Sequence, residues 1–228
     1  IIGNAAGGCP TQTANFASQP LREANFTSFR NPCGDYRLTA DSVVVLPWLF
    51  GDKVRHRQSP RDAPLPKKYV AVQFDPNRLG MHPDLLARTL GTIATTHRLD
   101  VIFFRAGAIV DSLSAYRRVA RATESTLGGA GMPSVRVFED LDVWSIVSLI
   151  ASANLVLSTS LHVRIVSFAY SVPRISLHTY GNGDKLGRFV ENFDNDALRG
   201  LSSIGEKGLP TPSQALLHVA RVWLTRPD

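Results

Sequence analysis

A short polar turn, Ser158 to Ser160, separates an apolar run from an apolar helical segment, and His162 follows it. If the turn joins a strand directly to a helix, the backbone N–H groups of the first helical turn face a cleft. The positive end of the helix dipole faces the same way, which favours binding of an anion. The dipole also disfavours an imidazolium, so a neutral His162 could act as a base. The alternative is a histidine that only caps or packs against the helix start.

Further polar side chains are expected at the same edge of the fold. Gln73, Arg105 and Glu139 each stand at or just after the carboxyl end of an apolar run, where they would border a cleft in a doubly wound sheet. Lys185 ends a glycine-flanked loop that could close over an anion or could be a solvated turn. The six histidines lack the i, i+4 pairing with a helical carboxylate that a metal site would use. We therefore expect no metal and no cofactor.

The elements that position these residues alternate between short apolar runs and longer amphipathic segments, which is typical of a parallel sheet covered by helices. We expect strands over residues 69–74, 101–104, 135–138, 155–157 and 172–177. Helices are expected to begin at Pro83, at Asp111 and after Asp140 or Asp142, and to cover residues 161–170 and 212–225. The predicted fold class is thus α/β with a doubly wound sheet.

The first third of the chain has a different pattern. Short β-type runs occur at residues 25–29 and 42–46, and residues 55–66 are basic and punctuated by proline, as in an exposed connection. We therefore assign residues 1–66 to the tail of an N-terminal domain plus a linker, and residues 67–228 to a C-terminal domain with a closing helix. The chain lacks an initiator methionine and opens like the end of a strand, so we expect upstream sequence.

Composition narrows the possible partners. The net charge of +6 predicts affinity for phosphate-bearing ligands, but zinc-finger spacing, RNP-type aromatic and basic interleaving and a basic region with heptads are all missing. We therefore expect no nucleic acid partner. Only Cys9 and Cys33 are present, which indicates free thiols and a reducing, cytoplasmic location. No apolar run reaches the roughly 18 residues that a membrane span requires.

The turn and the helix after it resemble a known family. Residues 158–162, followed by an apolar helix that ends at residues 169–173, are similar to the signature of the polysaccharide pyruvyl transferases. That signature is a strand, Ser/Thr/Arg, Leu-His, a small apolar helix and Gly-Val-Pro. Val163 and Ser171 stand where the family usually has glycine, and Val163 is expected to narrow the site beside His162.

Other segments resemble the family in the same order along the chain. Residues 2–8 resemble its glycine-rich strand end, residues 23–30 its segment of acidic, aromatic and small residues ending in arginine, and residues 185–189 its lysine-containing loop. Asn31 departs from the acidic residue that usually follows the arginine. The resemblance thus covers most of the chain, and it is most specific over residues 158–173.

The resemblance implies a GT-B-like fold, in which two Rossmann-like doubly wound domains face a cleft, with the N-terminal domain incomplete here. It also implies transfer of the enolpyruvyl group of phosphoenolpyruvate, as a ketal, onto hydroxyls of a saccharide or a lipid-linked saccharide. Arg30 would clamp the donor, His162 would act as acid or base across the cleft, and Ser160 and Leu161 would contact donor or substrate. Peripheral association with the membrane that carries polysaccharide precursors is a further expectation.

Two other functions remain open at this stage. A GT-B glycosyltransferase that uses a nucleotide sugar would place its diphosphate at the same helix terminus. For that function Glu191 is the only acidic residue near the position that would hold a ribose. A non-catalytic sugar-binding or scaffolding relative is the third hypothesis, motivated by Val163 and Asn31.

Overall fold

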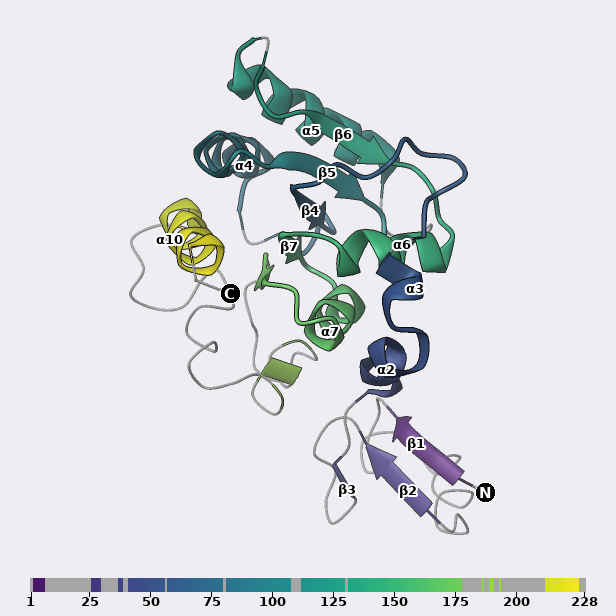
Figure 1. Cartoon of the computed structure of the whole chain (residues 1–228). Coiled ribbons are helices and arrows are strands. Elements are labelled where there is room, and N and C mark those ends of the chain that lie inside the picture. Colours follow the sequence, from purple (N-terminus) through teal and green to yellow (C-terminus); the bar gives the residue numbers. More distant parts are fainter. Residues whose placement is uncertain are drawn as a thin grey trace.

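The described residues form two parallel sheets (Figure 1). The structure is a computed structural model that describes residues 2–6, 26–29, 37–38, 41–55, 57–79, 81–107, 112–129, 131–177, 186, 189–190, 193 and 212–225. The first sheet has the order β1 (Ile2–Ala6), β2 (Phe26–Phe29), β3 (Arg37–Leu38). The strand predicted at residues 25–29 is thus confirmed as β2.

The second sheet has five parallel strands in the order β6-β5-β4-β7-β8. They are β4 (Tyr69–Gln73), β5 (Asp100–Phe104), β6 (Val135–Phe138), β7 (Leu155–Ser158) and β8 (Arg174–Ser176). The chain builds outward from β4 to β6 and then returns to add β7 on the other side of β4. The direction of winding therefore reverses between β4 and β7, which is where ligands bind in doubly wound sheets.

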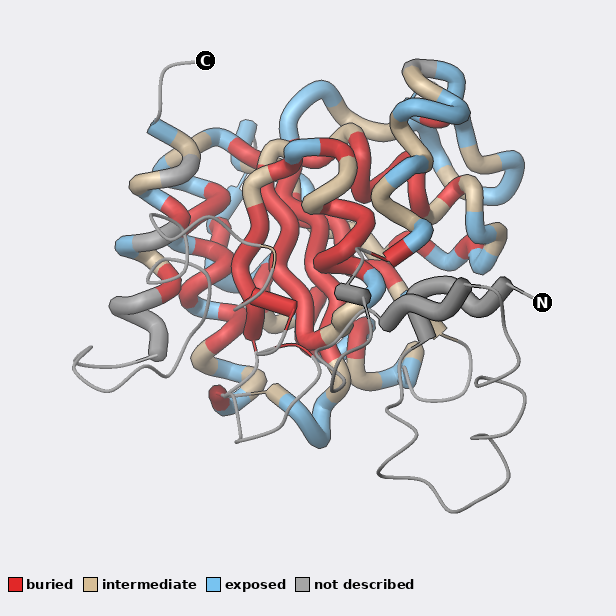
Figure 2. Tube along the Cα trace, turned by 90° about the horizontal axis from the view of Figure 1, so that it is seen from below, coloured by how far each residue is buried: buried red, intermediate tan, exposed pale blue. Residues whose placement is uncertain are grey.

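Helices cover both faces of this sheet because successive strand residues point to opposite sides. Val70 and Val72 pack with α4 (Pro83–His97), α5 (Leu113–Leu127) and α10 (Pro212–Leu224). Tyr69 and Ala71 pack with α6 (Val143–Ala151) and α7 (Leu161–Ala169). Figure 2 shows the buried strands enclosed between these layers. All five predicted strands and the predicted helices are confirmed to within a few residues.

The strand expected at residues 42–46 is wrong. The segment is helical instead, as η1 (Ser42–Val45), α2 (Leu46–Phe50) and α3 (Asp52–Arg55). The Asp41 carboxylate caps the first turn by accepting from Val43 N at 3.1 Å, and Pro47 lies in the first turn of α2, where its fixed φ favours a helix. These local signals outweigh the strand preference of three consecutive valines.

The basic connection that precedes β4 is tied to the second sheet rather than loose. The Ser59 hydroxyl donates to the Asp140 carboxylate at 2.7 Å, and the Asp62 carboxylate accepts from the Asp140 backbone N–H at 2.9 Å. The Arg136 guanidinium donates to the Ala63 carbonyl at 3.1 Å. The Ser59 hydroxyl is the main reason that the pKa of Asp140 is lowered. The domain division at residue 66 stays a prediction.

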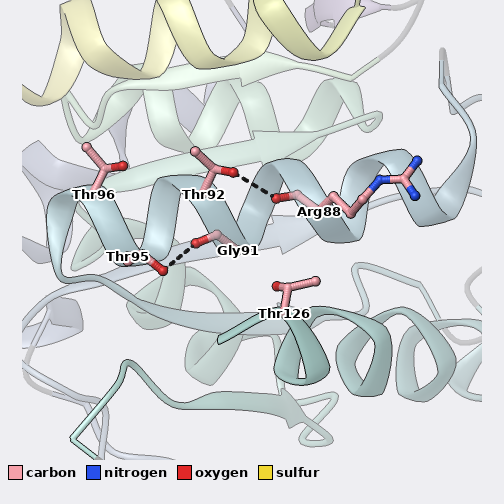
Figure 3. Close-up of a pocket in the computed structure, with 6 residues that line it drawn as sticks. All are labelled: Arg88, Gly91, Thr92, Thr95, Thr96 and Thr126. Atoms are coloured by element: carbon pink, nitrogen blue, oxygen red, sulfur yellow. Dashed lines mark hydrogen bonds between the residues drawn. The ribbon is translucent and has the colours of Figure 1, made fainter. Parts of the chain in front are cut away.

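Gly91 marks a close approach between α4 and α5. A shallow concavity on this outer helix layer is lined by Arg88, Gly91, Thr92, Thr95, Thr96 and Thr126 (Figure 3). A Cβ added at Gly91 would overlap Thr126 Oγ1 and lie 3.0 Å from Thr126 Cβ. Glycine is therefore needed for helix packing at this position.

We predict that Gly91→Ala lowers the free energy of unfolding by about 1–3 kcal/mol, because the added methyl overpacks the helix contact. Urea denaturation would measure this change. In an open helix the same substitution stabilises by about 1 kcal/mol, so the sign itself is diagnostic. Adding Thr126→Ala removes the overlapping hydroxyl and should restore most of the loss. A Gly91→Ala protein as stable as the parent would contradict the packing described here.

Candidate functional site

The carboxyl ends of β4 and β7 are cross-linked by polar groups. Gln73 and Ser158 are register partners at the last positions of the two strands. The Ser158 hydroxyl donates to Gln73 Oε1 at 2.6 Å, and both side chains are buried. One residue further on, Thr159 Oγ1 accepts from the Asp75 backbone N–H at 2.8 Å. Side-chain hydrogen bonds, in addition to the backbone hydrogen bonds of the sheet, therefore hold the carboxyl ends of β4 and β7 together.

Ser158 also shapes the turn that leads into α7. Its oxygen accepts from the Ser160 backbone N–H at 2.8 Å while its proton is given to Gln73. Both hydrogen-bonding capacities of the hydroxyl are thus used in holding the turn. Ser158 is therefore a positioning residue, and it sets where α7 begins.

The N-terminus of α7 is open to an anion. Ser160 is the N-cap residue but its side chain makes no capping hydrogen bond, and no acidic residue lies in the first turn. The first intrahelical bond runs from Arg164 N to the Ser160 carbonyl at 3.2 Å. The N–H groups before it lie at the positive end of the helix, where phosphate or carboxylate is favoured. The turn therefore joins β7 directly to α7 as expected, while anion binding there, with Ser160 and Leu161 at the edge, stays a prediction.

His162 lies in this first turn and is exposed. It makes no hydrogen bond or ion pair with the part of the chain that the structure describes, so its ring is accessible to a ligand. Val163, by contrast, is buried in the apolar cluster formed with α6. Its side chain points into the core, so the expectation that Val163 narrows the site beside His162 is wrong.

Two buried arginines that the sequence interpretation overlooked lie on α7 and β8. Arg164 is only 3% exposed and donates from Nη1 to the Ser176 hydroxyl at 2.7 Å, which ties α7 to the end of β8. The Arg174 guanidinium lies 4.9 Å from the centre of the Phe168 ring. A lone arginine within the apolar segment of α7 was the signal that could have found Arg164. Arg164 thus lies near the start of α7, whereas Arg174 begins β8 and lies against the last turn of α7.

Arg105 and Glu139 are separated by the strand order. Arg105 follows β5, and its Nε is buried with no hydrogen-bond partner among the described residues. Neighbouring strands lie about 4.8 Å apart, so β5 ends roughly 10 Å from β7, within reach of an arginine side chain and a ligand between them. Glu139 follows the edge strand β6 and accepts from Arg117 Nη2 at 2.6 Å. Gln73, Ser160, Leu161, His162 and Arg105 thus share the reversal point, whereas Glu139 does not.

Comparison with solved structures identifies the architecture. The UDP-GlcNAc 2-epimerase of Methanocaldococcus jannaschii, solved with UDP-GlcNAc and UDP, superimposes with a TM-score of 0.53 at 15% identity over 84% of this chain and 49% of that one. A second structure of that epimerase gives 0.54 at 14% identity, over 83% and 50% of the two chains. The fold is GT-B-like.

The other comparisons found weaker structural matches and no matching family or curated protein. A UDP-forming trehalose-phosphate synthase from Burkholderia xenovorans aligns with a TM-score of 0.45 at 12% identity, over 84% of this chain and 45% of that one. The chain spans about half the length of the structures it matches. No family model and no curated protein matches it. The structures named are sugar-processing enzymes, and none is a pyruvyl transferase.

Some predicted residues lie outside the described part of the GT-B-like chain. These are Arg30, Asn31, Lys185 and Glu191, so the pairing of Arg30 with His162 across a cleft stays a prediction. Within the described ranges no three His, Cys, Asp or Glu side chains gather as metal ligands. Among those same residues no helix has the length and hydrophobicity to cross a membrane.

We predict that Ser158→Ala lowers the free energy of unfolding by about 1–3 kcal/mol, because it removes two hydrogen bonds at a buried strand end of the GT-B-like sheet. Ser160→Ala in the same turn is the matched control. The Ser160 side chain makes no capping bond, so its loss should change stability by no more than about 0.5 kcal/mol. Chemical denaturation of both variants gives the comparison. Equal stability of the Ser158→Ala and Ser160→Ala variants would show that the hydrogen bonds of Ser158 do not stabilise the fold.

Proposed function

We propose that this chain carries the donor site of a GT-B glycosyltransferase that uses a nucleoside diphosphate sugar. The observation that supports the proposal most is the open N-terminus of α7 at the strand reversal point. Arg105 follows the neighbouring strand β5, and its buried Nε has no hydrogen-bond partner among the described residues. A fold shared with an epimerase solved with UDP-GlcNAc and UDP is consistent with such a donor.

Glycosyl transfer requires groups that stabilise a diphosphate and accept a proton, and the strand-end edge of the sheet carries candidates for both. When the bond between the sugar carbon and the diphosphate oxygen breaks, negative charge grows on the diphosphate. The N–H groups at the start of α7 and the Arg105 guanidinium would stabilise that charge without reorganising. An acceptor hydroxyl then bonds to the same sugar carbon and gives its proton to a base. His162, exposed beside the site, would accept this proton.

Pyruvyl transfer is the second candidate, and the motif over residues 158–173 favours it. Ser171 adopts φ 57° at the end of α7, a left-handed conformation that accounts for the glycine this family has there. Phosphoenolpyruvate would place its phosphate or carboxylate at the same anion site. Two sugar hydroxyls would bond to its central carbon, a proton would convert its methylene to a methyl group, and phosphate would leave.

Titration calorimetry separates the two candidates. We expect UDP and UDP-GlcNAc to bind the protein more tightly than phosphoenolpyruvate does. Binding of phosphoenolpyruvate without binding of either nucleotide would favour pyruvyl transfer instead. Binding of neither donor would remove both enzymatic proposals. Donor binding with no turnover on any saccharide acceptor would support the non-catalytic alternative.

We predict that Arg105→Met weakens UDP binding by about tenfold or more, because a hydrogen bond to a charged group contributes about 1.5–3 kcal/mol. Loss of Nε itself should cost little stability, since Nε has no hydrogen-bond partner among the described residues, and thermal melting of the variant checks this. The matched control is Arg118→Met, an exposed arginine on α5. Calorimetry on both variants measures the difference. An unchanged affinity in Arg105→Met would exclude Arg105 from the donor site.

His162→Ala should behave differently from the Arg105 variant. We predict turnover to fall by roughly 10² to 10⁴, the range for a lost general acid or base, with donor affinity nearly unchanged. Steady-state kinetics combined with calorimetry would measure both quantities. A loss of affinity with turnover intact at saturating donor would instead make His162 a binding residue.

A further inference from the structure

A second surface of the protein exposes large apolar side chains. The α2 patch, as we call it, consists of five residues from α2 and its neighbours: Val45 (41% exposed), Trp48 (85%), Leu49 (56%), Phe50 (41%) and Val143 (62%). Single exposed apolar residues are common on protein surfaces. A group of neighbouring ones that includes the largely exposed Trp48 indicates an interaction site.

The α2 patch is continuous and firmly supported. The Phe50 ring meets the Trp144 ring edge-on with centroids 4.8 Å apart, which joins α2 to the first turn of α6 beside Val143. On the inner side of the same segment, Val43 and Leu46 pack against the core beneath α6 and α7. The exposed residues of the α2 patch therefore lie on a segment that is packed against the core.

The charge around the α2 patch is positive. Residues 45–61 contain four basic side chains, Lys53, Arg55, Arg57 and Arg61, against one acidic residue, Asp52, which gives a net +3. All four basic residues are exposed. Two further acidic side chains lower this excess to +1: Asp142, next to Val143, pairs with Arg57 at 3.2 Å and caps α6, and Asp62 accepts from the backbone N–H groups of Glu139 and Asp140.

We propose that the α2 patch docks on the surface of a bilayer that contains anionic phospholipid. Tryptophan, leucine and phenylalanine beside lysine and arginine are the combination by which an element inserts shallowly into the headgroup region. Basic residues add attraction to an anionic surface. The proposal does not depend on the donor. Because α6 begins where β6 ends, the patch borders the strand-end edge of the sheet, where a lipid-carried acceptor would be presented.

Vesicle co-sedimentation tests the proposal with the whole chain. We expect binding to vesicles of phosphatidylcholine with added phosphatidylglycerol, weak binding to phosphatidylcholine alone, and a decrease as salt rises. Trp48→Ser should reduce binding by about tenfold or more, the effect of losing one large buried apolar side chain. The matched control is Met132→Ser, which is also exposed but lies before the opposite end of β6 and should bind like the parent.

Several outcomes would overturn the proposal. Absence of vesicle binding at low salt would do so, as would equal binding by the parent and Trp48→Ser. A concentration-dependent dimer that Trp48→Ser abolishes, seen by sedimentation velocity without vesicle binding, would mean that a second copy covers the patch. Thermal melting of both variants shows that they fold, and Trp48 is exposed enough that its replacement should not unfold the protein.

Discussion

The parallel pairing of β4 with β7 is the constraint on which the candidate site depends. It brings together two segments more than eighty residues apart in sequence, and Ser158 then fixes both the strand end and the following turn. A hydroxyl that donates to one buried group and accepts from another has no rotational freedom left. The start of α7 is consequently set by the sheet, and so is the direction of its N–H groups.

Positive charge lies both at the surface and in the interior near the start of α7. The helix terminus and Arg105 lie at the strand-end edge, where a ligand could meet them. Arg164 lies deeper, bonded to Ser176, so that it contributes charge while holding α7 against β8. Burying a guanidinium is unfavourable unless it is hydrogen-bonded, and the bond from Arg164 to Ser176 helps to meet this requirement.

The sequence predicted most of the second sheet because its central strands β4, β5 and β7 are buried on both faces and are nearly continuous apolar runs between amphipathic helices. It predicted the polar turn that joins β7 to α7, and anion binding at that turn stays a prediction. The sequence could not show that Val163 faces the core. In a nine-residue helix that is mostly buried, the pattern of polar residues does not define which face is exposed.

The helical segment at 42–50 was mispredicted because Asp41 and Pro47 act locally against three strand-favouring valines. The engagement of Glu139 with Arg117 depends on strand order, which a linear pattern does not carry.

In the proposed donor site, the first turn of α7 at the reversal point binds the anionic part of the donor. A crystal structure of the protein grown with UDP would show whether it does. We expect phosphate oxygens within hydrogen-bonding distance, about 2.7–3.2 Å, of the His162 and Val163 backbone N–H groups, with Arg105 Nε turned to the same ligand. A diphosphate bound elsewhere, with this helix terminus contacting only water, would contradict it.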